Sequence, residues 1–107
     1  MSFKILGTGS FLPQKVLTND DLSKIVDTSD EWITQRVGVK ERRVCTTESN
    51  TYMAVEAANS ALKNAGVAPE ELDMIIGTTI SADSISPGMA CMVQNRIGAT
   101  CPAFDIN

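Results

Sequence analysis

Trp32 and Arg36 are the two side chains of this chain whose spacing most directly suggests chemistry. Trp32 is the only tryptophan, and Arg36 follows it by four residues. In a helix, side chains four residues apart lie on the same face, so the indole and the guanidinium group would be neighbours. The indole could stack on a purine, and the planar, permanently charged guanidinium could bind a phosphate. A lone tryptophan can instead cover a small core, and these residues alone favour that simpler interpretation.

The residues around Trp32 predict a short helix. Thr28 and Glu31 have the spacing of a capping box, in which a hydroxyl and a carboxylate accept hydrogen bonds from free amides at the helix start. Asp30 and Glu31 also place negative charge at the positive end of the helix dipole. Gly38 is expected to end the helix.

The cysteines do not predict a reactive or metal-binding centre. The chain has three cysteines (Cys45, Cys91 and Cys101) at no metal-ligand spacing, and it has no histidine. Cys101 precedes a proline at the entrance to a predicted strand and lacks the helix start or basic partner that activates a thiol. Cys91 falls within an apolar helical pattern, and we interpret it as a small core residue.

The hydrophobic pattern predicts alternating strands and helices. Strands are expected at 3–7, 37–44 (an edge strand or hairpin arm), 73–80 and 103–106. Helices are expected from a Thr18 cap to about residue 26, around Trp32, from a Ser49 cap to residue 65, and from Ser86 and Pro87 to about residue 98. This order predicts an α/β fold with a mostly parallel sheet flanked by helices, in which the strand at 73–80 is covered on both faces.

Two helical faces indicate close packing. In the long helix, small side chains recur at steps of three and four residues, at Ala54, Ala57, Ala58, Ala61 and Ala65. Such a face allows another element to approach the helix backbone closely. In the last helix, one apolar stripe consists of Met89, Val93 and Ile97.

Composition narrows the function classes. The 107 residues carry a net charge of −4, with 43% hydrophobic and 21% charged residues, which is ordinary for a soluble globular domain spanning 1–107. There is no basic stripe interleaved with aromatics, so nucleic acid binding is not predicted. No signal peptide or apolar run of membrane-spanning length is recognisable, and we expect a cytoplasmic protein that does not bind membranes.

Several segments, in order and spacing, resemble the opening of β-ketoacyl-acyl-carrier-protein synthase III, a thiolase-like condensing enzyme. They are residues 4–13, 18–19, 27–43, 56–58 and 101–105. The resemblance covers the whole chain, and the segment 27–43 is its most specific part. It implies the amino-terminal portion of a thiolase-like fold, a partial half of a five-layered αβαβα body.

The resemblance also implies a reaction and a set of site residues. Enzymes of this family condense an acyl-CoA primer with malonyl-acyl-carrier protein and release carbon dioxide and CoA, and they need no cofactor or metal. The residues matching Thr28, Trp32 and Arg36 hold the adenine end of CoA. Ser86 lies where one subunit of a homodimer reaches toward its partner's acyl pocket, so it is a candidate for the acyl pocket and the dimer contact.

The catalytic residues of the family are not expected in this chain. The family's nucleophilic Cys follows the strand matching 103–107, and its catalytic His and Asn lie much later. We therefore expect an amino-terminal fragment that is inactive without the remaining carboxy-terminal part. The alternatives are a related acyl-CoA condensing enzyme of secondary metabolism, or a non-catalytic α/β module that binds CoA or a protein.

Overall fold

The structure is a computed structural model that describes residues 1–106. Its elements are β1 (Lys15–Thr18), α1 (Asn19–Ser23), α2 (Asp30–Val37), β2 (Glu41–Val44), α3 (Asn50–Ala65), a 3-10 turn (Pro69–Glu71), β3 (Ile75–Thr78), α4 (Met89–Ile97) and β4 (Ala103–Ile106). The chain forms two compact units. The smaller unit is Leu12–Glu48, and the larger unit joins Met1–Phe11 to the chain from Ser49 onward.

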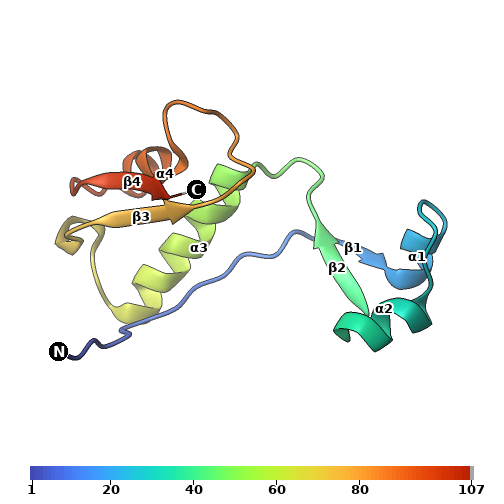
Figure 1. Ribbon diagram of the computed structural model, residues 1–107. Helices are drawn as coiled ribbons and strands as arrows, with labels where there is room; N and C mark the ends of the chain where they lie inside the picture. The colour runs from blue at the N-terminus through green and yellow to red at the C-terminus, as the bar shows by residue number, and fades with distance from the viewer. Residues whose placement is uncertain (107) are drawn as a thin grey trace. The chain divides into compact units, whose positions relative to one another are not determined.

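The larger unit is built on a parallel pair of strands. β3 and β4 pair in register from Ile75 opposite Ala103 to Thr78 opposite Ile106, and α3 and α4 lie beside them (Figure 1). Its core consists of Val55 from α3 with Met89 and Val93 from α4, against which Ala54, Ala58 and Ile97 pack. The predicted apolar stripe of α4 and the parallel strand pair are therefore confirmed.

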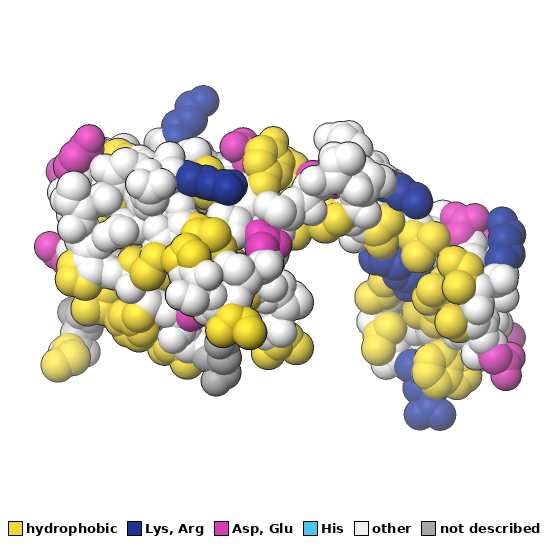
Figure 2. Space-filling model, turned by 90° about the horizontal axis from the view of Figure 1, so that it is seen from above, with side chains coloured by type: hydrophobic (Ala, Val, Ile, Leu, Met, Phe, Trp, Pro, Cys, Tyr) yellow, Lys and Arg dark blue, Asp and Glu magenta, His cyan; other side chains and the backbone are white. Residues whose placement is uncertain are grey.

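One face of the β3–β4 pair remains uncovered, which corrects the expectation of a strand buried on both sides. Gly77 and Asp105 face α4, because Asp105 accepts a hydrogen bond from that helix and Gly77 lies close to Met89. Side chains alternate along a strand, so the exposed Ile76 and Phe104 lie on the opposite face. Hydrophobic side chains are visible at the surface of both units (Figure 2).

The long helix α3 is bounded as predicted. The Ser49 hydroxyl accepts a hydrogen bond from the Tyr52 amide at 3.1 Å, and Gly66 ends the helix with a φ of 66°. The alanine face of α3 is used by the amino-terminal segment as well as by the core. A Cβ added at Gly7 would lie 2.7 Å from the Ala65 nitrogen, so only a glycine can lie this close to the helix.

The predicted strand at residues 3–7 is wrong. No helix or strand forms within residues 1–13, and this segment runs along α3 (Figure 1). A strand requires a neighbouring strand to satisfy its backbone hydrogen bonds, and the described sheets contain only β1 with β2 and β3 with β4. The segment is held instead by contacts such as the 2.8 Å hydrogen bond from Asn64 to the Thr8 carbonyl.

The smaller unit contains an antiparallel ribbon and two short helices. β2 confirms the arm predicted at 37–44, but its partner β1 was not predicted. The predicted cap at Thr18 is confirmed, because its hydroxyl accepts a hydrogen bond from the Asp21 amide at 3.1 Å. The Asp21 carboxylate in turn accepts a hydrogen bond from the Thr18 amide. α1 ends at Ser23, earlier than expected.

A buried asparagine joins the elements of the smaller unit. Asn19 is 1% exposed. Its Nδ2 donates hydrogen bonds to Asp30 Oδ1 and to the Val39 carbonyl, both at 2.8 Å, and its Oδ1 accepts one from Arg42 Nη2 at 2.7 Å. One amide group therefore links the first residue of α1 to the start of α2 and to β2.

The start of α4 differs from the prediction. Ser86 and Pro87 do not begin the helix, which starts after Gly88 without a side-chain cap from its own N-cap residue. A carboxylate from another element takes that role, because Asp105 Oδ1 on β4 accepts a hydrogen bond from the Ala90 amide at 2.8 Å. A local cap is therefore unnecessary at this helix.

Replacing the buried amide tests its role. We expect Asn19→Ala to lower the free energy of unfolding of the smaller unit by about 2–3 kcal/mol, because it leaves buried polar partners unsatisfied. Urea denaturation followed by the fluorescence of Trp32, which lies in this unit, measures the change. Asn59→Ala on the exposed surface of α3 is the control, with an expected change within about 0.5 kcal/mol. Equal effects of the two substitutions would contradict the role of Asn19.

The capping box of α1 predicts a specific pH dependence. Hydrogen bonds from Thr18 and Lys24 lower the pKa of Asp21 from its usual 3.8 to about 2. A carboxylate with a lowered folded-state pKa stabilises the fold above its unfolded pKa and loses this contribution as the pH falls through the folded value. Melting curves should show Asp21→Asn below wild type at neutral pH, with the difference disappearing between about pH 4 and pH 2. A difference that persists unchanged at pH 2 would refute this account.

Candidate nucleotide-binding site

Trp32 and Arg36 form an exposed pair on α2. The Arg36 Cζ lies 5.6 Å from the centre of the Trp32 ring, a cation–π distance. The indole is 57% exposed, so it does not serve as the cover of a small core. The prediction that the indole and the guanidinium group are neighbours is confirmed, and the aromatic ring is accessible to a ligand.

The helix that carries this pair begins one residue later than predicted. Its N-cap is Ser29, whose hydroxyl accepts a hydrogen bond from the Trp32 amide at 3.1 Å. The predicted capping box of Thr28 with Glu31 is therefore wrong, whereas the predicted end at Gly38, with a φ of 73°, is confirmed. With Ser29 as the N-cap, Asp30 is the first helical residue and Thr28 lies outside the helix. The Asp30 carboxylate accepts a hydrogen bond from Asn19.

Thr28 nevertheless shares a cavity with Trp32. A depression of about 380 Å³ is lined by Asp27, Thr28, Ser29 and Trp32. Its volume falls within the range of small-molecule sites, about 300–1,000 Å³. The structure thus brings Thr28 and Trp32 to one cavity and places the Arg36 guanidinium over the same indole ring.

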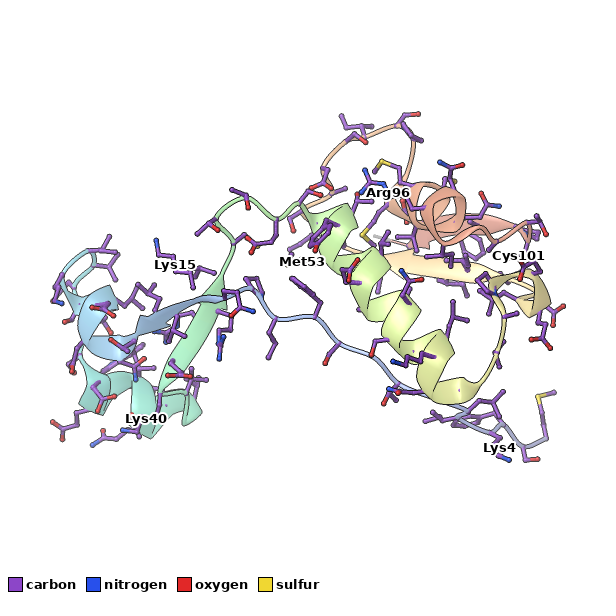
Figure 3. All side chains as sticks on the ribbon, turned by 180° about the vertical axis from the view of Figure 1, so that it is seen from behind. Lys4, Lys15, Lys40, Met53, Arg96 and Cys101 are labelled. Carbon is purple, nitrogen blue, oxygen red and sulfur yellow. The ribbon has the colours of Figure 1, made fainter. Side chains whose placement is uncertain are left out.

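The charges around α2 leave Arg36 available. Lys40 Nζ pairs with Asp30 Oδ2 at 3.1 Å, and the position of Lys40 beside α2 is seen in Figure 3. The hydrogen bond from Asn19, followed by that from Lys40, lowers the pKa of Asp30. Within residues 1–106, the two ion pairs are Lys40 with Asp30 and Lys24 with Asp21. Arg36 belongs to neither pair, so its guanidinium is free to receive an anionic group.

Sequence reasoning missed Asn19 as a supporting residue of this site. An asparagine that follows a threonine cap has the appearance of an ordinary first helical residue, because polar residues are common there. Its partners Asp30, Val39 and Arg42 lie 11 to 23 residues away. The one available signal was the match of residues 18–19 to the family pattern.

Ser86 lies by itself in the larger unit, on the exposed loop between β3 and α4. A second cavity, of about 540 Å³, is lined by residues 79–85 of that loop and by Asp105. Ser86 is adjacent in sequence to this lining but does not contribute to it. Its role in an acyl pocket or dimer contact stays a prediction.

The cysteines differ in burial. Cys101, labelled in Figure 3, is buried just before β4, and its carbonyl accepts a hydrogen bond from Gln94. Cys91 is exposed, which corrects its interpretation as a core residue. It lies off the stripe of Met89 and Val93 that faces α3, because residues two apart on a helix point in widely different directions. Its Sγ donates to the Ala103 carbonyl at 3.5 Å.

Among the described residues, no three histidine, cysteine or acidic side chains are grouped closely enough to hold a metal ion. No helix within residues 1–106 has the length and apolar character needed to cross a bilayer.

Comparisons with known proteins agree on one kind of relative, although no family model matches the chain. The β-ketoacyl-[acyl-carrier-protein] synthase III of Clostridium acetobutylicum is 50% identical over 107 residues, which are 99% of this chain and 33% of that protein. The crystal structure of 3-oxoacyl-[acyl-carrier-protein] synthase III from Aquifex aeolicus matches with a TM-score of 0.92 at 56% identity, over 96% of this chain and 34% of that one. The priming β-ketosynthase of the R1128 polyketide pathway matches at 0.90 and 30% identity, over 96% and 31%.

These matches show the class of protein to which the chain is similar. Its fold is part of a thiolase-like fold, as the high structural similarity to two such enzymes shows. Within that class, the chain is similar over nearly its whole length to part of the β-ketoacyl-[acyl-carrier-protein] synthase III enzymes, which confirms the predicted resemblance. The chain spans about a third of the length of the curated relatives it matches. The lower identity to the polyketide enzyme does not favour the secondary-metabolism alternative.

The corrected N-cap of α2 gives a direct test of the site's support. We expect Ser29→Ala to destabilise the helix by about 1 kcal/mol, because the Trp32 amide loses its hydrogen-bond acceptor. Amide hydrogen exchange at Trp32 should accelerate accordingly. Thr28→Ala is the matched control and should leave this exchange rate nearly unchanged. A larger effect at Thr28 than at Ser29 would restore the cap predicted from the sequence.

Proposed function

We propose that this chain is the amino-terminal part of a β-ketoacyl-acyl-carrier-protein synthase III that initiates fatty acid synthesis. The complete enzyme condenses an acyl-CoA primer with malonyl-acyl-carrier protein and releases carbon dioxide and CoA. The observation that carries this proposal is the exposed pair of Trp32 and Arg36, with the Arg36 Cζ 5.6 Å from the centre of the indole ring. The pair lies in a chain of which 99% aligns with such a synthase.

In this proposal, the cavity beside Trp32 receives the nucleotide end of CoA. The adenine base stacks on the exposed indole, a contact that suits any flat heteroaromatic ring. Arg36 supplies a fixed positive charge beside the ring for a phosphate group. Thr28 lines the cavity with Trp32, and its hydroxyl, which can both donate and accept, is proposed to hydrogen-bond a polar group of the nucleotide.

The chemical steps belong to the remaining part of the enzyme. A thiol nucleophile needs a nearby base or a helix start to become reactive, and the buried Cys101 is inaccessible to an acyl thioester. The chain contains no histidine that could serve as the base. We therefore expect this chain alone to be inactive in condensation. The complete enzyme is proposed to be a cytoplasmic homodimer in which Ser86 contributes to the acyl pocket.

Removing the indole tests the nucleotide role. In the complete enzyme, we expect Trp32→Ala to raise the KM for the acyl-CoA primer about tenfold or more, because base stacking contributes about 1–3 kcal/mol. Steady-state kinetics with varied acyl-CoA measure the effect. Trp32→Phe, which keeps an aromatic face, should retain most of the affinity.

The second substrate supplies the internal control. The KM for malonyl-acyl-carrier protein should stay unchanged in Trp32→Ala, because that substrate lacks the CoA nucleotide. Unchanged acyl-CoA kinetics in this variant would remove Trp32 from the ligand site. An equal rise in both KM values would point to general damage rather than to a lost stacking contact.

A further inference from the structure

Asp83 connects the loop between β3 and α4 to the start of α3. Its Oδ1 accepts a hydrogen bond from the Asn50 amide at 2.9 Å, and its Oδ2 accepts one from the Thr51 amide at 2.7 Å. The first amides of a helix have no partner within the helix. The Ser49 hydroxyl accepts a hydrogen bond from the next amide, that of Tyr52. Asp83 and Ser49 together therefore supply acceptors for the first three amides of α3.

Other polar contacts support the same connection. The Asn50 Nδ2 donates to Thr79 Oγ1 at 2.9 Å and to the Ser81 carbonyl at 2.8 Å. The loop runs from the end of β3 past the start of α3 to α4 (Figure 1, orange). The hydrogen bonds from Thr51 and Asn50 lower the pKa of Asp83, so its carboxylate stays charged at neutral pH and makes strong, charge-assisted bonds.

Packing does not hold this loop. The large apolar side chains of the loop, Ile80 and Ile85, are fully exposed. The loop also has no helix or strand between Thr79 and Gly88. Its far end is fixed by Asp105, whose carboxylate binds the Ala90 amide. The position of the loop therefore depends on its hydrogen bonds to the start of α3 and on its junction with α4.

The loop forms most of the wall of a cavity. Residues 79–85 and Asp105 line the space of about 540 Å³ described above, and Ser86 directly follows this lining. A shift of the loop would change the shape of the cavity and move Ser86 with it. Asp83 is one of the residues that line the cavity, and its two hydrogen bonds join this wall to the start of α3.

We propose that Asp83 is a positioning residue for primer selection: by fixing the loop on α3, it sets the space available to the acyl chain. This inference rests on the proposed synthase function and on the acyl-pocket role of Ser86. Asp83 does not contact the reacting atoms in this account. It acts through the loop, so its loss should change the choice between primers more than the rate of turnover.

The test compares Asp83→Ala and Asp83→Asn with wild type in the complete enzyme. Hydrogen exchange of the Asn50 and Thr51 amides should accelerate about tenfold in Asp83→Ala, because both acceptors are lost. In Asp83→Asn, one oxygen remains, so a smaller acceleration is expected. Asp73→Asn is the control, since no hydrogen bond to this exposed carboxylate is found among the described residues, and it should leave both amides unchanged.

The functional readout is the ratio of kcat/KM for acetyl-CoA and for hexanoyl-CoA. We expect this ratio to change at least about fivefold in Asp83→Ala, less in Asp83→Asn, and not in Asp73→Asn. If both primers lose activity equally, or the ratio is constant, Asp83 has only a structural role and the inference is overturned. If wild type uses neither acyl-CoA, the proposed function itself fails and primer selection fails with it, while the exchange rates still decide whether Asp83 anchors the loop.

Discussion

The smaller unit depends on the buried amide of Asn19 more than on a hydrophobic core. Among its described residues, Ile33 is the one large hydrophobic side chain that is buried. Asn19 uses both donor hydrogens and its acceptor on Asp30, Val39 and Arg42. Because an unsatisfied buried polar group costs about 1–3 kcal/mol, these partners can separate only at a high energetic cost. Directional hydrogen bonds thus fix the helices and the ribbon in one arrangement.

This arrangement explains how α2 can expose a tryptophan. Ile33 turns inward and supplies the apolar contact of the helix, while the adjacent Trp32 points to solvent with Arg36 beside it. A helix held only by apolar packing would gain most from burying its largest ring. Here Asn19 and Lys40 also bind the helix through Asp30, and the indole stays exposed and accessible to a ligand.

The larger unit uses a related device at its helix starts. Carboxylates distant in sequence cap both helices, Asp83 at α3 and Asp105 at α4. Side chains at Gly77 or Gly88 would collide with the Asp105 carboxylate, so glycine at both positions makes room for it. In each unit, therefore, acidic groups and amides join segments that hydrophobic contacts alone leave loosely connected. The apolar core of Val55, Met89 and Val93 packs the facing sides of α3 and α4 against each other.

The range of each interaction along the chain explains what the sequence could predict. Periodic apolar residues and adjacent caps gave α3 with both of its ends, the packed stripe of α4, and the neighbourhood of Trp32 and Arg36. The errors arise where a partner lies far away in sequence. The bonds of Asn19 to Asp30, Val39 and Arg42 were not predicted, and Asp105 on β4 supplies the acceptor at the start of α4 where a Ser86 cap was expected. The expected strand at 3–7 has no neighbouring strand among the described residues. Local sequence patterns carry no information on partners that are distant along the chain. The family resemblance predicted the candidate site because it matches Thr28, Trp32 and Arg36 to the positions that bind CoA in that family.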